Sequence, residues 1–193
     1  MARNLRVPAV VPIALSALSF AVSCTLEPRG VTTNERIKPS YNADTGRLER
    51  ITYDRNQDGR VDATAFMDGT RVVRAELDED YNGTTDRWEH YAAMTAANSA
   101  GRVQDGSQGV LQRVEVAGRA DGKVSRWEFY EGGFMQRAEE DADGDGRVDK
   151  WETWSNGSLS SVALDTRGRG TPDRRLVYIG EGEPRLELDP TSP

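Results

Sequence analysis

Aspartate residues recur at alternate positions in several short loops of this 193-residue chain. The most acidic stretch begins at Asp141 and reads Asp-Ala-Asp-Gly-Asp-Gly-Arg-Val-Asp, which places carboxylates at positions one, three, five and nine. Carboxylates spaced in this way around a tight turn converge on one point, and the glycine at position six permits the sharp bend. Calcium, which takes about six to eight oxygen ligands, is the cation that suits such a loop best.

Three loops carry the complete pattern, and they begin at Asp54, Asp78 and Asp141. Side-chain oxygens at positions one, three, five and nine, with the backbone carbonyl at position seven, form the predicted ligand set. We therefore predict three structural Ca²⁺ sites. The predicted ligands are, loop by loop, Asp54, Asn56, Asp58, Arg60 and Asp62; Asp78, Asp80, Asn82, Thr84 and Asp86; and Asp141, Asp143, Asp145, Arg147 and Asp149.

These loops resemble the calcium loops of EF-hand and thrombospondin type 3 proteins, the broad Asp-x-Asp-x-Asp-Gly class. The resemblance covers nine to twelve residues per copy and implies calcium binding. It departs at position twelve, where an EF-hand has a bidentate glutamate on its exiting helix. Here position twelve is Ala65, Glu89 or Glu152, inside a predicted strand, and whether the two glutamates reach the metal stays open. A sensor opens a helix pair, and none is predicted here.

Two further copies of the loop have lost their ligands. The copy that begins at Ala117 has Arg119 at position three, and the copy that begins at Asp165 has arginine at positions three and five. Arginine cannot bind a cation, but its guanidinium can pair with neighbouring carboxylates such as Asp165 and Asp173. We expect either a built-in positive charge or simple loss of the site.

The loops recur with a fixed spacing, which indicates a repeat architecture. The starts at 54, 78, 117, 141, 165 and 189 are 24 residues apart, except for one interval of 39. Between loops, strand-forming residues flank a tight-turn signal such as Asn156-Gly157, so each repeat reads as strand, turn, strand and loop. We predict an all-β fold of repeated antiparallel hairpins, about twelve strands, over residues 36–189, with an insertion at 92–109. An open sheet and a closed barrel remain alternatives.

The strands carry regular columns of charged and aromatic residues. Arginine and glutamate columns share one strand face by the two-residue period, so that neighbouring hairpins can set these charges against one another. We favour a solvated face with weak surface ion pairs over a charged binding face. Aromatic columns that include Trp88, Trp127 and Trp151 can stack on sugar rings, but we favour packing against the sheet.

The N-terminal 23 residues predict a targeting segment. Arg3 and Arg6 precede an apolar run that is too short for a membrane span and ends in Ala21-Val22-Ser23-Cys24. This end resembles the lipobox of bacterial lipoproteins, which implies cleavage of residues 1–23, lipidation of Cys24 and, since Thr25 follows, an outer-membrane location. Residues 24–35 then read as a flexible tether, and residues 190–193 as a tail.

The composition argues against two classes of function, nucleic-acid binding and catalysis. Removal of residues 1–23 takes away two arginines and no acid, so the net charge of −7 becomes −9, and no basic patch indicates nucleic acid. One histidine, His90, and one cysteine leave little support for an enzyme. We expect a membrane-anchored, calcium-stabilised module of the cell envelope with a structural or interaction role. The alternative is a glycan-binding or adhesive module, so the partner is an envelope protein or a glycan.

Overall fold

The computed structural model describes residues 36–93, 109–119, 121–179 and 183–188, all within a compact unit that spans residues 33–193. The predicted leader and tether, the predicted tail and most of the predicted insertion lie outside these residues. Within them the structure is all-β, as predicted, and no helix is present. In the part of the chain that is described, no helix is long and apolar enough to span a membrane.

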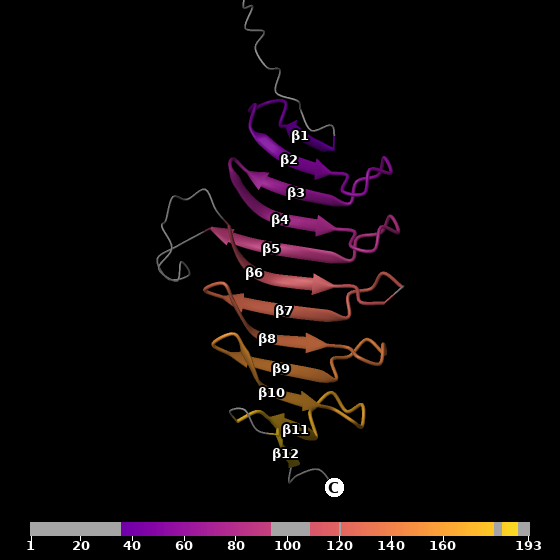
Figure 1. Ribbon diagram of the computed structural model, residues 1–193, viewed down its shortest axis with the longest axis vertical. Coiled ribbons are helices and arrows are strands. Elements are labelled where there is room, and N and C mark those ends of the chain that lie inside the picture. The colour runs from indigo at the N-terminus through magenta and orange to yellow at the C-terminus, as the bar shows by residue number, and fades with distance from the viewer. Residues whose placement is uncertain (1–35, 94–108, 120, 180–182, 189–193) are drawn as a thin grey trace, which may run out of the picture. The chain divides into compact units, whose positions relative to one another are not determined.

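Twelve strands form a single antiparallel sheet in strict chain order (Figure 1). Each strand pairs only with the strands next to it in sequence, and β1 and β12 do not meet within the described residues, so the sheet is open rather than a barrel. The strands are β1 (Ile37–Tyr41), β2 (Leu48–Tyr53), β3 (Ala63–Asp68), β4 (Arg71–Leu77), β5 (Arg87–Ala93), β6 (Gly109–Val116), β7 (Arg126–Glu131), β8 (Phe134–Glu140), β9 (Lys150–Ser155), β10 (Ser158–Leu164), β11 (Arg174–Val177) and β12 (Arg185–Leu188).

Tight turns and acidic loops alternate along the chain, so the turns lie at one end of the strands and the acidic loops at the other (Figure 1). The turns follow odd-numbered strands and use left-handed residues, as at Asn156 (φ 51°) and Gly157 (φ 78°). The acidic loops follow even-numbered strands from β2 to β10. The repeat therefore places all five acidic loops in a row along the same edge, where the even-numbered strands end.

One face of the sheet, here called the tryptophan face, carries alternating tryptophan and glutamate. Cross-strand pairing places Trp88, Glu115, Trp127, Glu139 and Trp151 in one row from β5 to β9. The arginines beside this row pair with glutamates on their own strands, as Arg113 does with Glu115 at 2.5 Å. The arginine and glutamate columns thus form surface ion pairs within single strands rather than between neighbouring hairpins, because their cross-strand neighbours are largely aromatic.

The opposite face, here called the glutamate face, alternates small apolar residues with glutamate. Its central row runs through Glu89, Val114, Glu128, Ala138 and Glu152. Val114 is fully buried and Ala138 is 1% exposed, yet few other apolar side chains among the described residues are buried. A single layer cannot bury much apolar surface, so strand pairing and charged networks must hold this sheet together.

Candidate metal centres

The five acidic loops have one backbone conformation, which glycine makes possible. Position six is glycine in every loop and is left-handed in all five, with φ from 68° to 91°: Gly59, Gly83, Gly122, Gly146 and Gly170. Position four is also left-handed in four loops, at Gln57, Tyr81, Gly144 and Gly168. This double turn folds the loop back on itself and directs the side chains of positions one, three and nine toward its centre.

Aspartates at positions one and nine accept backbone hydrogen bonds within four of the five loops, the exception being the loop from Ala117. In the loop from Asp141, the carboxylate of Asp141 accepts hydrogen bonds from the N–H groups of Gly144 (2.6 Å) and Gly146 (3.0 Å). The carboxylate of Asp149 accepts from Ala142 and Asp143, each at 3.1 Å. A carboxylate has about four acceptor sites, so these bonds leave lone pairs for a cation.

Two loops bring three carboxylates together. Oxygens of Asp78, Asp80 and Asp86 lie within 4.8 Å of one another, and so do those of Asp141, Asp143 and Asp149. In each triad the first residue is buried, the second exposed and the third half-buried, so a cation can enter from solvent. These two triads can hold a metal ion, and they contain positions one, three and nine of the predicted ligand sets.

The loop from Asp54 differs, although its sequence pattern is complete. Position three is Asn56, whose amide nitrogen donates to Asp58 at 3.1 Å. The carboxylates of Asp54 and Asp62 accept backbone N–H groups of their own loop, as those of Asp141 and Asp149 do, and Gly59 donates to Asp54 at 3.0 Å. No triad of carboxylates forms in this loop, so its predicted site rests on mixed amide and carboxylate oxygens.

The predicted ligands at positions five and seven lie outside the triads. Asp145 accepts a hydrogen bond from the N–H of Arg147 at 2.8 Å, and Asn82 accepts one from Thr84 at 2.7 Å. The Arg147 guanidinium reaches the carbonyl oxygen of Gly168 in the next loop, at 3.5 Å. The Arg147 side chain therefore points along the row of loops, and only its backbone carbonyl is left as a candidate ligand.

Arginine in the degenerate loops pairs with carboxylates, as expected for a built-in positive charge. Arg119 donates to the carbonyl oxygen of Asp141 and lies 3.7 Å from its carboxylate, against Gly144. Arg167 lies 3.5 Å from the carboxylate of Asp173 in its own loop. Thus Arg119 serves the neighbouring metal-competent loop rather than its own.

The side chain at position twelve lies on the sheet and not among the carboxylates of the loop. Glu89 and Glu152, together with Glu128 of the degenerate copy, lie on the glutamate face. Glu152 binds Arg126 at 2.8 Å, Lys150 at 2.9 Å and the indole N–H of Trp154 at 3.3 Å. These carboxylates are thereby committed to the sheet.

The same arrangement recurs in three strands, and sequence reasoning missed it. The segments 87–91, 126–130 and 150–154 share the pattern Arg or Lys, Trp, Glu, any residue, Tyr or Trp. In each, the basic residue and the final aromatic residue both bind the glutamate, as Arg126 (2.9 Å) and Tyr130 (2.9 Å) bind Glu128. The two-residue spacing was the available signal, because residues i and i+2 share a strand face.

Ion pairs and hydrogen bonds shift the pKa values of several of these side chains. Hydrogen bonding from Arg126, assisted by Lys150, lowers the pKa of Glu152 to about 2 although burial acts in the opposite direction. Burial and the bond to Glu89 raise the pKa of the Tyr91 hydroxyl. In the loops, burial opposes ionisation of Asp141, but the N–H groups of Gly144 and Gly146 and the guanidinium of Arg119 hold its pKa below the usual value.

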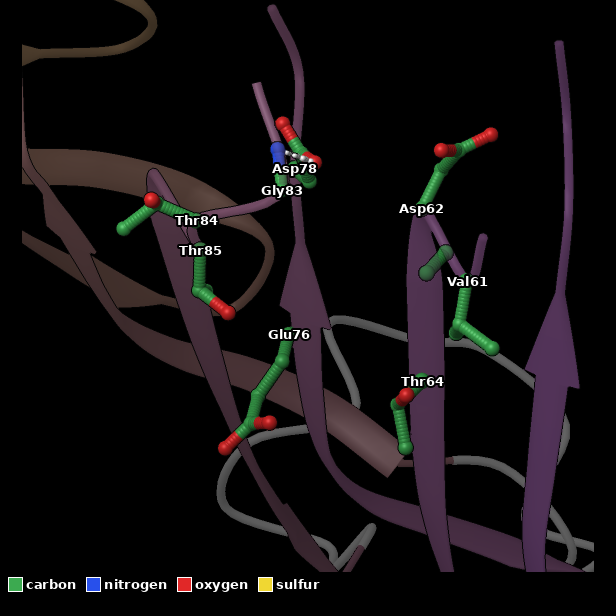
Figure 2. Close-up of a pocket in the computed structure, with 9 residues that line it drawn as sticks. Val61, Asp62, Thr64, Glu76, Asp78, Gly83, Thr84 and Thr85 are labelled. Atoms are coloured by element: carbon green, nitrogen blue, oxygen red, sulfur yellow. Dashed lines mark hydrogen bonds between the residues drawn. The ribbon is translucent and has the colours of Figure 1, made fainter. Parts of the chain in front are cut away.

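A small polar hollow lies beside two of the loops, on the tryptophan face (Figure 2). Thr64 stands in the row where later strands have tryptophan, and the space of about 60 Å³ opens between Thr64, Glu76 and Thr85. Figure 2 shows Asp78 bonded to the N–H of Gly83 at its rim. The lining is polar and the space is small, so the hollow suits ordered water.

Comparisons with known proteins show no family. No protein-family model and no curated protein matches the sequence. Among solved structures nine chains match, and one of them belongs to a GtfA/B complex bound to UDP and GlcNAc. That match has 14% sequence identity and a TM-score of 0.38, and it covers 60% of this chain and 22% of the other. A likeness at this level says nothing about the function of this chain.

The Glu152 network predicts a pH-dependent stability. Because the folded-state pKa is about 2 and the ordinary value of a glutamate is 4.5, the stabilisation by Glu152 is complete above pH 4.5 and is lost as pH falls toward 2. Glu152→Gln should cost about 2 kcal/mol at pH 7 and should flatten the fall of stability in this window. Urea unfolding between pH 2 and 7 measures both effects. Glu131→Gln, at an exposed turn, is the control, and an equal loss there would contradict the assignment.

Proposed function

We propose that this chain is a calcium-stabilised lipoprotein of the bacterial cell envelope with a structural or interaction role. The observation that carries the proposal is the pair of aspartate triads in equivalent loops at one side of an open sheet. Such a sheet has little core, so ions that bridge clustered carboxylates are an effective source of stability. Calcium also removes the repulsion between the carboxylates of each triad.

The chemistry of the loops supports calcium over other cations. All side-chain donors at positions one, three, five and nine of the three complete loops are oxygens, and neither triad includes histidine or cysteine, the ligands that zinc prefers. Magnesium demands a near-octahedral shell and keeps several waters, whereas calcium accepts irregular oxygen shells. Outside the cell, sites with dissociation constants of about 10⁻⁴–10⁻³ M are sufficient.

Calcium should stabilise the folded chain. Each site that binds only the folded state adds about 2.7 kcal/mol when calcium exceeds its dissociation constant a hundredfold. The melting temperature should therefore be higher in millimolar calcium than in EDTA, as followed by circular dichroism. Identical melting curves under the two conditions would exclude a structural role for the ion.

Ion counting by native mass spectrometry separates the loops. We expect three calcium ions per chain, one in each complete loop. Asp80→Ala should lose one ion because it removes the exposed member of a triad. Asp121→Ala, the same substitution at position five of the degenerate loop that contains Arg119, should leave the count unchanged. A wild-type chain without bound calcium, or an ion lost from Asp121→Ala, would contradict the assignment.

The N-terminal sequence supports anchoring in the outer membrane through lipid on Cys24. The basic start, the apolar run and the small residues before Cys24 form the lipobox pattern. More than one acyl chain on the cysteine makes such an anchor stable. The tether over residues 24–35 would then separate the sheet from the membrane.

Cys24→Ser should release the chain from the membrane without loss of fold, because the sheet begins at Ile37. Metabolic labelling with a fatty-acid analogue, followed by membrane fractionation, should show label and membrane association for the wild-type chain only. A wild-type chain that takes no label and stays in the soluble fraction would refute the anchor.

A glycan-binding function is the second candidate, favoured by the row of Trp88, Trp127 and Trp151 on a face that no other described element covers. These tryptophans are two strands apart, a spacing of about 9–10 Å that suits successive sugar units of an extended polysaccharide. Trp127→Ala should then weaken binding to peptidoglycan or other envelope polysaccharides at least tenfold in a pull-down assay. Trp154→Phe, on the glutamate face, should leave binding unchanged. Equal effects of the two variants would reject this use of the tryptophan face.

A further inference from the structure

The two edge strands of the sheet present exposed apolar side chains. Neither β1 nor β12 has a strand on its outer side within the described residues. Ile37 on β1 is 44% exposed, and Leu186 and Leu188 on β12 are 55% and 65% exposed. An edge strand with unpaired backbone groups and exposed apolar residues is a template for pairing with another strand.

The outward backbone groups of each edge follow from the alternation of antiparallel pairing. Asp54 donates to the carbonyl oxygen of Arg36 at 3.0 Å, so the backbone groups of Ile37 and Pro39 point away from β2. By the same alternation, the backbone groups of Leu186 and Leu188 point away from β11. The two edges therefore offer backbone groups with matching spacing.

The register of the repeat fixes how these two edges would meet. Inside the sheet, the last residue before an acidic loop faces the first residue of the next strand, as Tyr53 faces Ala63 and Leu164 faces Arg174. Leu188 precedes the position where the next loop would begin. Ile37 faces Tyr53 just as Ala63 faces Leu77, so Ile37 and Ala63 hold equivalent places.

Side chains in that register are complementary. Leu188 of one copy would face Ile37 of the next, and Leu186 would face Pro39, apolar against apolar on the glutamate face. Glu187 would face Lys38 on the tryptophan face. Opposite charges in directly facing positions stabilise antiparallel pairs, and like charges destabilise them.

We propose that copies of this chain associate head to tail, with β12 of one copy pairing antiparallel to β1 of the next. The joint continues the sheet in its own register, and because it is heterologous it generates open rows rather than closed dimers. Pro39 lacks an N–H, so the joint has one backbone hydrogen bond fewer than a pair without proline. Association is consequently weak and reversible, and it grows with concentration.

Charge reversal at the joint tests the proposal. The full-length chain, purified in a mild detergent that covers any lipid, is followed by sedimentation velocity over a concentration series. Lys38→Glu and Glu187→Lys should each weaken association about tenfold, because each places like charges opposite one another. The double variant should regain the wild-type series of oligomers. An equimolar mixture of the two single variants should form rows in which the two variants alternate, since both joints between unlike variants are complementary and joints between like variants place like charges opposite one another.

Matched controls distinguish the joint from a general effect of charge. Lys123→Glu and Glu131→Lys make the same changes at exposed positions away from both edges and should leave association unchanged. Lys38 faces Thr52 within its own sheet, so Lys38→Glu breaks no cross-strand charge pair there, and circular dichroism verifies the fold of each variant. A wild-type chain that stays monomeric over the whole series, or a double variant that associates no better than the single ones, would overturn the proposal.

Discussion

A backbone hydrogen bond between neighbouring loops is the interaction on which this architecture depends. The N–H of position one in each loop donates to the carbonyl of position nine in the loop before it, at 2.7 Å from Asp78 to Asp62 and at 2.8 Å from Asp165 to Asp149. The bond continues the strand ladder past the ends of the strands and fixes the spacing of the loops. Both residues must therefore keep one conformation, and the aspartates at these positions are buried or half-buried at the rim of an otherwise thin sheet.

This constraint couples the candidate metal sites to the sheet. Position nine contributes a carboxylate to each triad and a carbonyl to the next loop, so an ion that orders one loop also orders the start of the next. Degenerate loops preserve the same backbone bond, as Ala117 donates to Asp86 and Asp141 donates to Ser125. Loss of the ligands has thus not interrupted the ladder, and Arg119 supplies a positive charge to the adjacent triad instead.

The two faces of the sheet are stabilised in different ways. On the glutamate face, Arg126 joins carboxylates from three strands, namely Glu128, Glu140 and Glu152, in place of the apolar layer that a thicker protein would have. On the tryptophan face, arginines are stacked on aromatic rings, with the Arg137 guanidinium 3.5 Å from the Phe129 ring centre. Charged side chains thereby bury their stems and pair with one another in a sheet that no second layer covers within the described residues.

The sequence by itself determined the repeat, the strands and the position of the acidic loops. Local signals decide these features: a two-residue period for strands, Asn156-Gly157 for a turn, and glycine at position six for the loop. The tertiary structure decided what depends on neighbouring repeats. One such feature is that the sheet is open, which the sequence could not decide because the strand order within a repeat is the same in a barrel and in an open sheet. The tertiary structure separated the triads at Asp78 and Asp141 from the looser loop at Asp54, where an amide replaces one carboxylate. The structure also places Glu89 and Glu152 away from the loop carboxylates. The strand that leaves each loop directs position twelve onto a face of the sheet, beside the basic residue two positions earlier.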